Sequence, residues 1–171
     1  MKKPLLIVIL LAAITFVAWA NWPADRLSAG TVADRIVIEK AERTLTLYRK
    51  GVALKAYRVS LGRVPVGAKE KEGDRKTPEG LYRIVEHKRA SRFHRALRIS
   101  YPESRDVQHA QSLGVNLGSD IMIHGLLNGI GLIGRAHQWV DWTAGCIALT
   151  NPEIEEISDA VTDGTEVEIR K

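Results

Sequence analysis

The sequence has a single cysteine, Cys146, among 171 residues. One cysteine cannot form a disulfide within its own chain, so this thiol is a buried bystander, an intermolecular link or a reactive group. The sequence has no HExxH, CxxC or paired-histidine spacing that would indicate a metal site, and the glycines from Gly125 to Gly134 lack the Gly-Lys-Ser/Thr ending of a phosphate loop. No metal or organic cofactor is therefore expected. Repeats and low-complexity segments are also lacking, which excludes repeat architectures.

The first twenty residues form an apolar segment with a basic start. Two lysines precede an uncharged run from Leu5 to Ala18, and Ala18-Trp19-Ala20 has the small-x-small pattern of a processing site. Residues 1–20 are therefore predicted to be a secretory signal peptide. An uncleaved inner-membrane anchor through residues 4–20 is the alternative. Both interpretations place the remaining chain in the periplasm or cell envelope.

Charge is unevenly spread along this chain, whose net charge is +5. Residues 69–98 hold ten Lys/Arg against five Asp/Glu, whereas residues 141–171 hold two against eight. A basic middle segment can meet an anionic polymer or lipid headgroups, although a solvated surface is the simpler interpretation. Nucleic acid is not an expected partner, because an exported chain rarely meets it and no recognised binding module is present.

Short strand-like segments dominate the chain after a small-residue linker at residues 21–31. Strands are predicted at residues 35–39, 43–49, 52–60, 81–86, 120–124 and 165–170, with another around Ile99 and Tyr101. Short helices are predicted at 106–113 and, with Asn151 as N-cap, up to Val161. Residues 61–80 and 125–142 are predicted to be loops. The pattern favours one mainly β domain with small helices over residues 32–171.

The strongest local signal surrounds the cysteine. Gly145 precedes Cys146 and has no Cβ, so a substrate carbonyl could approach the backbone closely. The N–H groups of these two residues could together stabilise the oxyanion of an acyl-transfer intermediate. A thiol must become a thiolate to attack, and a neighbouring imidazole is the usual means.

His124 is the best candidate among five histidines for that imidazole. It ends a compact apolar strand and is followed by Gly125, so a rigid strand end would position it. A structural histidine is the plainer alternative for any single histidine. His137 is the main rival because it is close to Cys146 in sequence, but it lies in the predicted glycine-rich loop, where a base is held less firmly.

The order of these features resembles the L,D-transpeptidase catalytic domain, the YkuD-like family of bacterial cell-wall enzymes. A strand ends in His124-Gly125, a loop of about twenty residues follows, and Thr143-x-Gly-Cys146 comes next, similar to the family's His-x-(loop)-Ser/Thr-His-Gly-Cys signature. The segment Asp74 to Gly80 also resembles the family's Thr-Pro-x-Gly element. The resemblance spans roughly residues 35–170 and implies a β-sandwich of mixed sheets.

The resemblance implies roles for matching positions. Cys146 matches the nucleophile, His124 its general base, and Gly125 the residue whose carbonyl orients the imidazole. Gly145 and Cys146 match the oxyanion-hole amides. The residues predicted to line the substrate site are Thr143, Trp142 and His137.

Two positions depart from the family pattern. The usual histidine before the Gly-Cys pair is Ala144, and an arginine that is common two residues after the cysteine is Ala148. The nucleophile and base are retained, so the resemblance implies acyl transfer on the stem peptides of peptidoglycan through a thioester. An amine acceptor would give a cross-link, whereas water would make the enzyme a carboxypeptidase or amide hydrolase. A non-catalytic wall-binding module is a further alternative, and the sequence does not indicate an oligomeric state.

Overall fold

The structure of the protein is a computed structural model that describes residues 2–22, 25–118 and 120–171. Its helices and strands follow in chain order. They are α1 (Lys2–Ala20), β1 (Arg35–Glu39), β2 (Thr44–Arg49), β3 (Val52–Arg58), β4 (Gly80–Ser91), β5 (His94–Ile99), α2 (Ser104–Leu113), β6 (Met122–His124), the 3-10 segment η1 (Gly131–Trp139), β7 (Ile147–Ala148), α3 (Asn151–Ala160) and β8 (Glu166–Arg170).

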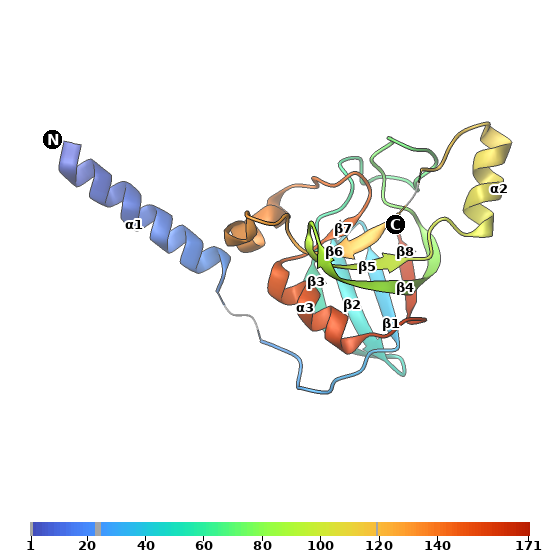
Figure 1. Ribbon diagram of the computed structural model, residues 1–171, viewed down its shortest axis with the longest axis horizontal. Helices are drawn as coiled ribbons and strands as arrows, with labels where there is room; N and C mark the ends of the chain where they lie inside the picture. The colour runs from blue at the N-terminus through green and yellow to red at the C-terminus, as the bar shows by residue number, and fades with distance from the viewer. Residues whose placement is uncertain (1, 23–24, 119) are drawn as a thin grey trace.

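The eight strands form one mixed sheet in the order β3-β2-β1-β8-β4-β5-β6-β7. β1 pairs in parallel with β8 and β6 with β7, while the other neighbours are antiparallel. The long strand β4 belongs to both halves of the sheet, because its first residues pair with β8 and its later ones with β5. Figure 1 shows the two halves crossing at β4. The predicted mainly β fold with small helices is confirmed, and the two sheets of the expected sandwich are halves of one sheet.

One apolar core fills the space between the halves of the sheet. Alternating strand residues supply it, as the two-residue period of a strand requires. Ile36 and Ile38 of β1 are fully buried, as are Leu45 and Leu47 of β2. Helix α3 covers this core with Ile154 and Ile157, which are also fully buried.

Helix α3 begins one residue earlier than an N-cap at Asn151 requires. Thr150 is the N-cap, with extended backbone angles, and its backbone N–H and hydroxyl both donate to Oε2 of Glu153, at 2.9 and 2.7 Å. The prediction of Asn151 as N-cap was therefore wrong by one position. The Asn151 side chain instead accepts a hydrogen bond from the backbone N–H of Leu126 at 2.8 Å, which ties the start of α3 to the segment after β6.

Several element boundaries differ from the sequence predictions. Strand β4 continues to Ser91 and β5 starts at His94, because an exposed hairpin needs no apolar alternation at its tip. Tyr101 lies beyond β5. Strand β6 starts at Met122, since Asp120 has a φ of 43° that ends an extended strand. The hairpin β2–β3, the loop before β4 and helix α2 agree with expectation.

The segment from Gly131 to Trp139 is not a plain loop as predicted. It forms 3-10 turns with a kink at Gly134, whose φ is 46°. A Cβ at Gly134 would lie 2.2 Å from the carbonyl oxygen of Ala20, so this close contact requires glycine. The Trp139 ring packs on the rings of Phe16 and Trp19, with centroids 6.1 and 5.6 Å apart, which anchors the segment on α1.

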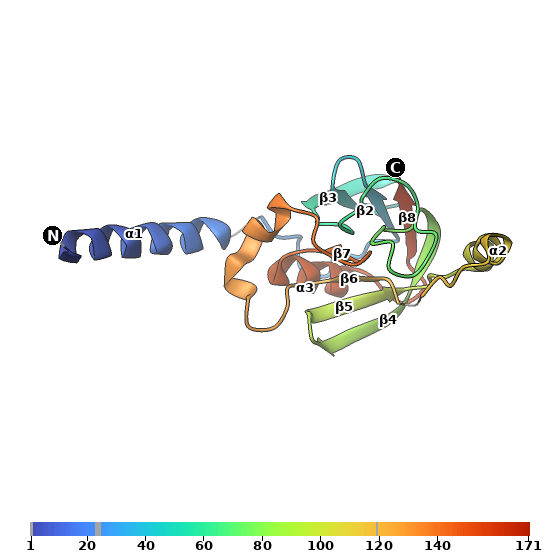
Figure 2. The ribbon, with the colours of Figure 1, turned by 90° about the horizontal axis from the view of Figure 1, so that it is seen from above.

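Helix α1 projects from the body of the domain, as Figures 1 and 2 show. Most of its described side chains from Leu5 to Trp19 are exposed. Within the described residues, no helix combines the length and apolar character that crossing a membrane requires. The division into residues 1–20, 21–31 and 32–171 stays a prediction, and residue 1 of the first segment and residues 23 and 24 of the linker lie outside the described residues.

Candidate active site

Strands β6 and β7 bring His124 and Cys146 to neighbouring positions of the sheet. Their parallel register pairs Ile123 with Ile147 and His124 with Ala148. Cys146 directly precedes β7 and is therefore level with Met122, two residues before His124. Because alternate residues of a strand share a face, the thiol and the imidazole lie on the same side of adjacent strands. Two residues that are 22 positions apart in the sequence thus meet at one sheet edge.

His124 is held from two directions. Its Nδ1 lies 2.7 Å from the carbonyl oxygen of Gly125, and since a carbonyl only accepts, Nδ1 carries the proton. The Phe93 ring packs against the imidazole, with centroids 4.3 Å apart. The other ring nitrogen, Nε2, is therefore the unprotonated one in the neutral imidazole and is free to accept a proton.

Burial keeps both reacting groups neutral. Burial lowers the pKa of His124, and this effect outweighs the hydrogen bond to Gly125, which raises it. Burial likewise raises the pKa of the Cys146 thiol, and a backbone hydrogen bond from Met122 and the charge of Lys69 oppose this only partly. At neutral pH the site holds a thiol and an imidazole, so attack requires a proton to move between them.

The thiol has backbone neighbours in the resting site. Its sulfur lies 4.0 Å from the carbonyl oxygen of Asp120. Among the described residues, no hydrogen bond joins the thiol to His124. Catalytic hydrogen bonds commonly tighten only when substrate binds, so the resting geometry is compatible with general-base catalysis.

Thr143 fixes the turn that carries Cys146. Its hydroxyl donates to the carbonyl oxygen of Cys146 at 2.7 Å and accepts from the Gly145 N–H at 3.1 Å. The residue is only 5% exposed, so its contacts are those of a structural clamp. A substrate contact by Thr143 stays a prediction, as does the oxyanion hole at Gly145 and Cys146. The Gly145 N–H is engaged by Thr143 in the resting state.

The loop before β4 packs directly beneath this turn. A Cβ at Gly145, whose φ is 139°, would lie 2.7 Å from the carbonyl oxygen of Lys76, so only glycine fits. Thr77 accepts a hydrogen bond from the Gly62 N–H at 3.0 Å through its hydroxyl. The Thr-Pro-x-Gly segment thus serves as a support for the nucleophile turn.

A buried ion pair stiffens the same loop. Lys69 and Asp74 are 2.8 Å apart, with side chains 5% and 7% exposed. Burial alone would raise the pKa of Asp74, but the Lys69 ammonium and backbone N–H groups of the loop outweigh it and lower the pKa to about 2. Lys69 is thus a cation close to Cys146 that already has a carboxylate partner.

His137 and Trp142 form a second layer beside the base. His137 is 5% exposed, and its Nδ1 accepts from the Trp142 indole at 3.3 Å and lies 3.2 Å from Oγ of Ser60. The Trp142 ring stands edge-on to both imidazoles, with its centroid 5.9 Å from that of His124 and 6.3 Å from that of His137. Burial lowers the pKa of His137 to about 4. Trp142 therefore lies between His137 and His124.

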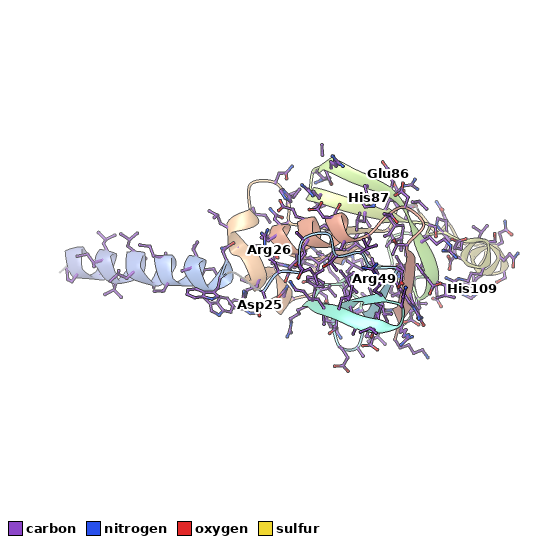
Figure 3. The ribbon with its side chains drawn as sticks, turned by 90° about the horizontal axis from the view of Figure 1, so that it is seen from below. Asp25, Arg26, Arg49, Glu86, His87 and His109 are labelled. Atoms are coloured by element: carbon purple, nitrogen blue, oxygen red, sulfur yellow. The ribbon has the colours of Figure 1, made fainter. Side chains whose placement is uncertain are left out.

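The other histidines lie outside this constellation. Figure 3 places His87 on the β4–β5 hairpin and His109 on α2, at the far end of the molecule from α1. His94 pairs with Glu155 of α3 at 2.6 Å.

Sequence reasoning missed three residues around the base. Phe93 contacts the His124 ring from the turn of the β4–β5 hairpin. Asn151 binds the backbone of the segment that follows His124, and Asn128, which lies in that segment, binds the backbone of the hairpin. Phe93 stands in a polar, basic stretch with no periodic pattern. Its role depends on a tertiary contact that no local sequence pattern indicates.

A family model described as the L,D-transpeptidase catalytic domain, YkuD, matches residues 33–169, which include both Cys146 and His124. The chain belongs to this family. YafK of Escherichia coli strain K12, whose name assigns it provisionally to the L,D-transpeptidases, is 34% identical over 133 residues. That match covers 74% of this chain and 46% of YafK, so the chain spans about half the length of the curated relatives it matches.

Solved structures of the family share this fold. The helical cell shape determining protein Pgp2 from Campylobacter jejuni superposes with a TM-score of 0.62 at 22% identity, over 93% of this chain and 55% of Pgp2. The L,D-transpeptidase LdtMt1, solved in complex with imipenem, gives a TM-score of 0.53 at 19% identity, over 79% of this chain and 57% of its own. The predicted membership of the L,D-transpeptidase family is thereby confirmed.

Proposed function

We propose that this chain is an L,D-transpeptidase that uses Cys146 to attack an amide of a peptidoglycan stem peptide. The observation that carries the proposal is the placement of His124 at the end of β6 and of Cys146 directly before the adjacent parallel strand β7, with Nδ1 of His124 fixed by the Gly125 carbonyl. L,D-transpeptidases act on peptidoglycan stem peptides, and this chain belongs to their family. The substrate bond is the amide between a diamino acid and the terminal D-amino acid of the stem.

The first half-reaction is acylation. His124 Nε2 takes the proton of the Cys146 thiol as the sulfur attacks the amide carbonyl. The carbonyl oxygen of the substrate becomes an oxyanion, which the backbone N–H of Cys146 would stabilise. The C–N bond then breaks, the protonated His124 gives its proton to the leaving amine, and a thioester on Cys146 remains.

The second half-reaction transfers the acyl group. The amine of a neighbouring stem attacks the thioester carbonyl while His124 accepts the amine proton. The C–S bond breaks and the proton returns to the sulfur, which leaves a new amide cross-link and the resting enzyme. Water as the acceptor would give hydrolysis by the same steps.

Export is part of the proposal. Family members work in the periplasm or cell envelope, and the basic start and apolar run of the first twenty residues fit a secretory signal or an anchor. Localising the full chain fused to a reporter that is active only outside the cytoplasm would test this, with a chain lacking residues 4–20 as the control. Reporter activity that persists without that segment would contradict the assignment.

Intact-protein mass spectrometry with a stem tetrapeptide tests the chemistry. The expected result is an adduct on Cys146 equal to the peptide minus its terminal residue, and, with excess amine-bearing stem, a cross-linked dimer. A hydrolysed tripeptide without any dimer would remove the transferase assignment and identify a carboxypeptidase. The absence of any adduct, with either a tetrapeptide or a carbapenem, would contradict the thioester and favour a wall-binding module.

A further inference from the structure

The turn of the β4–β5 hairpin is fastened to the segment that follows the catalytic base. Asn128 makes this connection. Its backbone N–H donates to the carbonyl oxygen of Arg92 at 2.9 Å, its side-chain N–H donates to Ser91 at 3.0 Å, and its Oδ1 accepts from the His94 N–H at 3.1 Å. Gly125 adds a backbone hydrogen bond to Arg95 at 3.1 Å. The hairpin tip therefore has a fixed position relative to His124.

Arg92 lies at this tip beside the active site. Its guanidinium carbon is 5.2 Å from the centre of the Phe93 ring, and that same ring contacts the imidazole of His124. The cation and the base thus share one aromatic neighbour. Arg92 is exposed, so its guanidinium is accessible to a ligand in solvent.

The cations around Arg92 are mostly paired, whereas Arg92 is not. Lys88 and Arg98 both reach Glu86, at 3.7 and 2.9 Å, and Arg95 reaches Asp159 at 3.1 Å. In the described part of the chain, no carboxylate lies within ion-pair distance of Arg92. Its planar, permanently charged guanidinium is free to donate two parallel hydrogen bonds to a carboxylate.

Two other cations near Cys146 are engaged in contacts within the protein. Nε of Arg63 donates to the carbonyl oxygen of Trp142 at 3.1 Å. Lys69 is paired with Asp74 in a buried site. Strand β7, which follows the nucleophile, consists of Ile147 and Ala148, and both are fully buried and apolar. A negatively charged group beside the scissile amide therefore has an unpaired cationic partner in Arg92, at the edge of the site.

We propose that Arg92 is a specificity-determining residue that binds a carboxylate of the substrate, the terminal α-carboxylate of the stem peptide. This inference rests on the proposed function, since the terminal carboxylate belongs to the residue that leaves during acylation and lies one residue from the scissile amide. The hairpin tip would bind the free carboxyl end of the stem peptide. Peptides whose end is blocked would lose this contact.

Binding to a chain that cannot react tests the assignment separately from catalysis. The dissociation constants of a stem tetrapeptide and of the same peptide with a terminal carboxamide are measured by calorimetry on full-length Cys146→Ala in detergent. The free acid should bind about tenfold more tightly, the scale of one charge-assisted hydrogen bond. Adding Arg92→Gln should abolish that difference by weakening the acid alone, and Arg92→Lys should restore part of it.

Arg89 provides a matched control. It is also exposed at the hairpin tip, and among the described residues it has no ion-pair partner, but it does not lie over Phe93. Arg89→Gln should keep the full preference for the acid. The proposal would be overturned if Arg92→Gln left the ratio of the affinities for the acid and the amide unchanged, or if Arg89→Gln lowered that ratio equally. Either result would indicate general attraction by a basic surface.

The outcome also separates this inference from the proposed function. A chain that shows the Arg92-dependent preference but forms no acyl-thioester with Cys146 in place would contradict acyl transfer and support the carboxylate site. A chain that forms the thioester equally well from acid and amide would support acyl transfer and overturn the Arg92 assignment.

Discussion

The carbonyl oxygen of Gly125 accepts the Nδ1 proton of His124, the residue directly before it, over 2.7 Å. This bond selects the tautomer whose Nε2 is unprotonated and can accept a proton. A Cβ at Gly125 would lie 2.8 Å from Oδ1 of Asn151 and 3.0 Å from the Phe93 carbonyl oxygen, so the close packing around this carbonyl requires glycine. The tight packing of Gly125 against Asn151 and Phe93 thus helps to fix the orientation of the His124 imidazole.

The identity of the base is the first prediction. His124→Ala should lower kcat by about 10²- to 10⁴-fold, because the thiol then lacks a proton acceptor. His137→Gln should have a much smaller effect, since Nδ1 of His137 is already engaged by Trp142 and Ser60. Steady-state release of the terminal amino acid measures both, with Cys146→Ala as the inactive reference. A larger loss of kcat in His137→Gln than in His124→Ala would instead identify His137 as the base.

The pH profile is the second prediction. Burial lowers the pKa of His124 from its usual 6.5, so the imidazole stays an effective base until the pH falls below that value. The acid limb of kcat/KM should therefore lie below pH 6.5. Burial raises the pKa of Cys146 above its usual 9.0, so alkylation by iodoacetamide should be slow at pH 7 and still increasing at pH 9. Maximal alkylation at pH 7 would instead indicate a preformed thiolate.

Acid stability is the third prediction and concerns Asp74. Its pKa is about 2 in the folded protein against 3.8 as the ordinary value. A lowered folded pKa contributes stability that is complete above pH 4 and is lost as the pH falls from about 4 to 2. The contribution is on the order of 2 kcal/mol. Asp74→Asn should lower stability at pH 7 and flatten its dependence over that interval, as urea unfolding at several pH values measures. A pH dependence of the unfolding free energy that is the same in Asp74→Asn and in the wild type would contradict this prediction.

The sequence indicated candidate residues for the chemistry better than it indicated their surroundings. Cys146 and His124 could be proposed because each adjoins a short apolar strand and a glycine, and such local patterns are visible in the sequence. Phe93 and Arg92 could not be, because they lie at a hairpin tip whose position depends on Asn128, 35 residues away from Phe93 along the chain. The helical turns of η1 were missed for a similar reason, since contacts with α1 hold a glycine-rich segment that has no strong propensity of its own.

The fourth prediction tests the clamp at Thr143. Its hydroxyl holds both the Gly145 N–H and the Cys146 carbonyl, so it fixes the turn in which the nucleophile is presented. Thr143→Val keeps the shape but removes both hydrogen bonds, and each buried group left unpaired costs about 1–3 kcal/mol. The nucleophile turn should loosen, with a fall in kcat that exceeds any change in KM. Thr143→Ser retains the hydroxyl and should restore kcat.

The same pair of variants distinguishes the clamp from a substrate contact. A hydroxyl that binds substrate would show its loss mainly in KM, and the stability of the free enzyme would change little. A hydroxyl that clamps the turn should lower the melting temperature of Thr143→Val with no substrate present and leave Thr143→Ser near wild type. Because the Gly145 N–H is released in Thr143→Val, a gain in kcat is the result that would contradict the clamp: it would mean that Thr143 restrains an oxyanion donor in the resting enzyme.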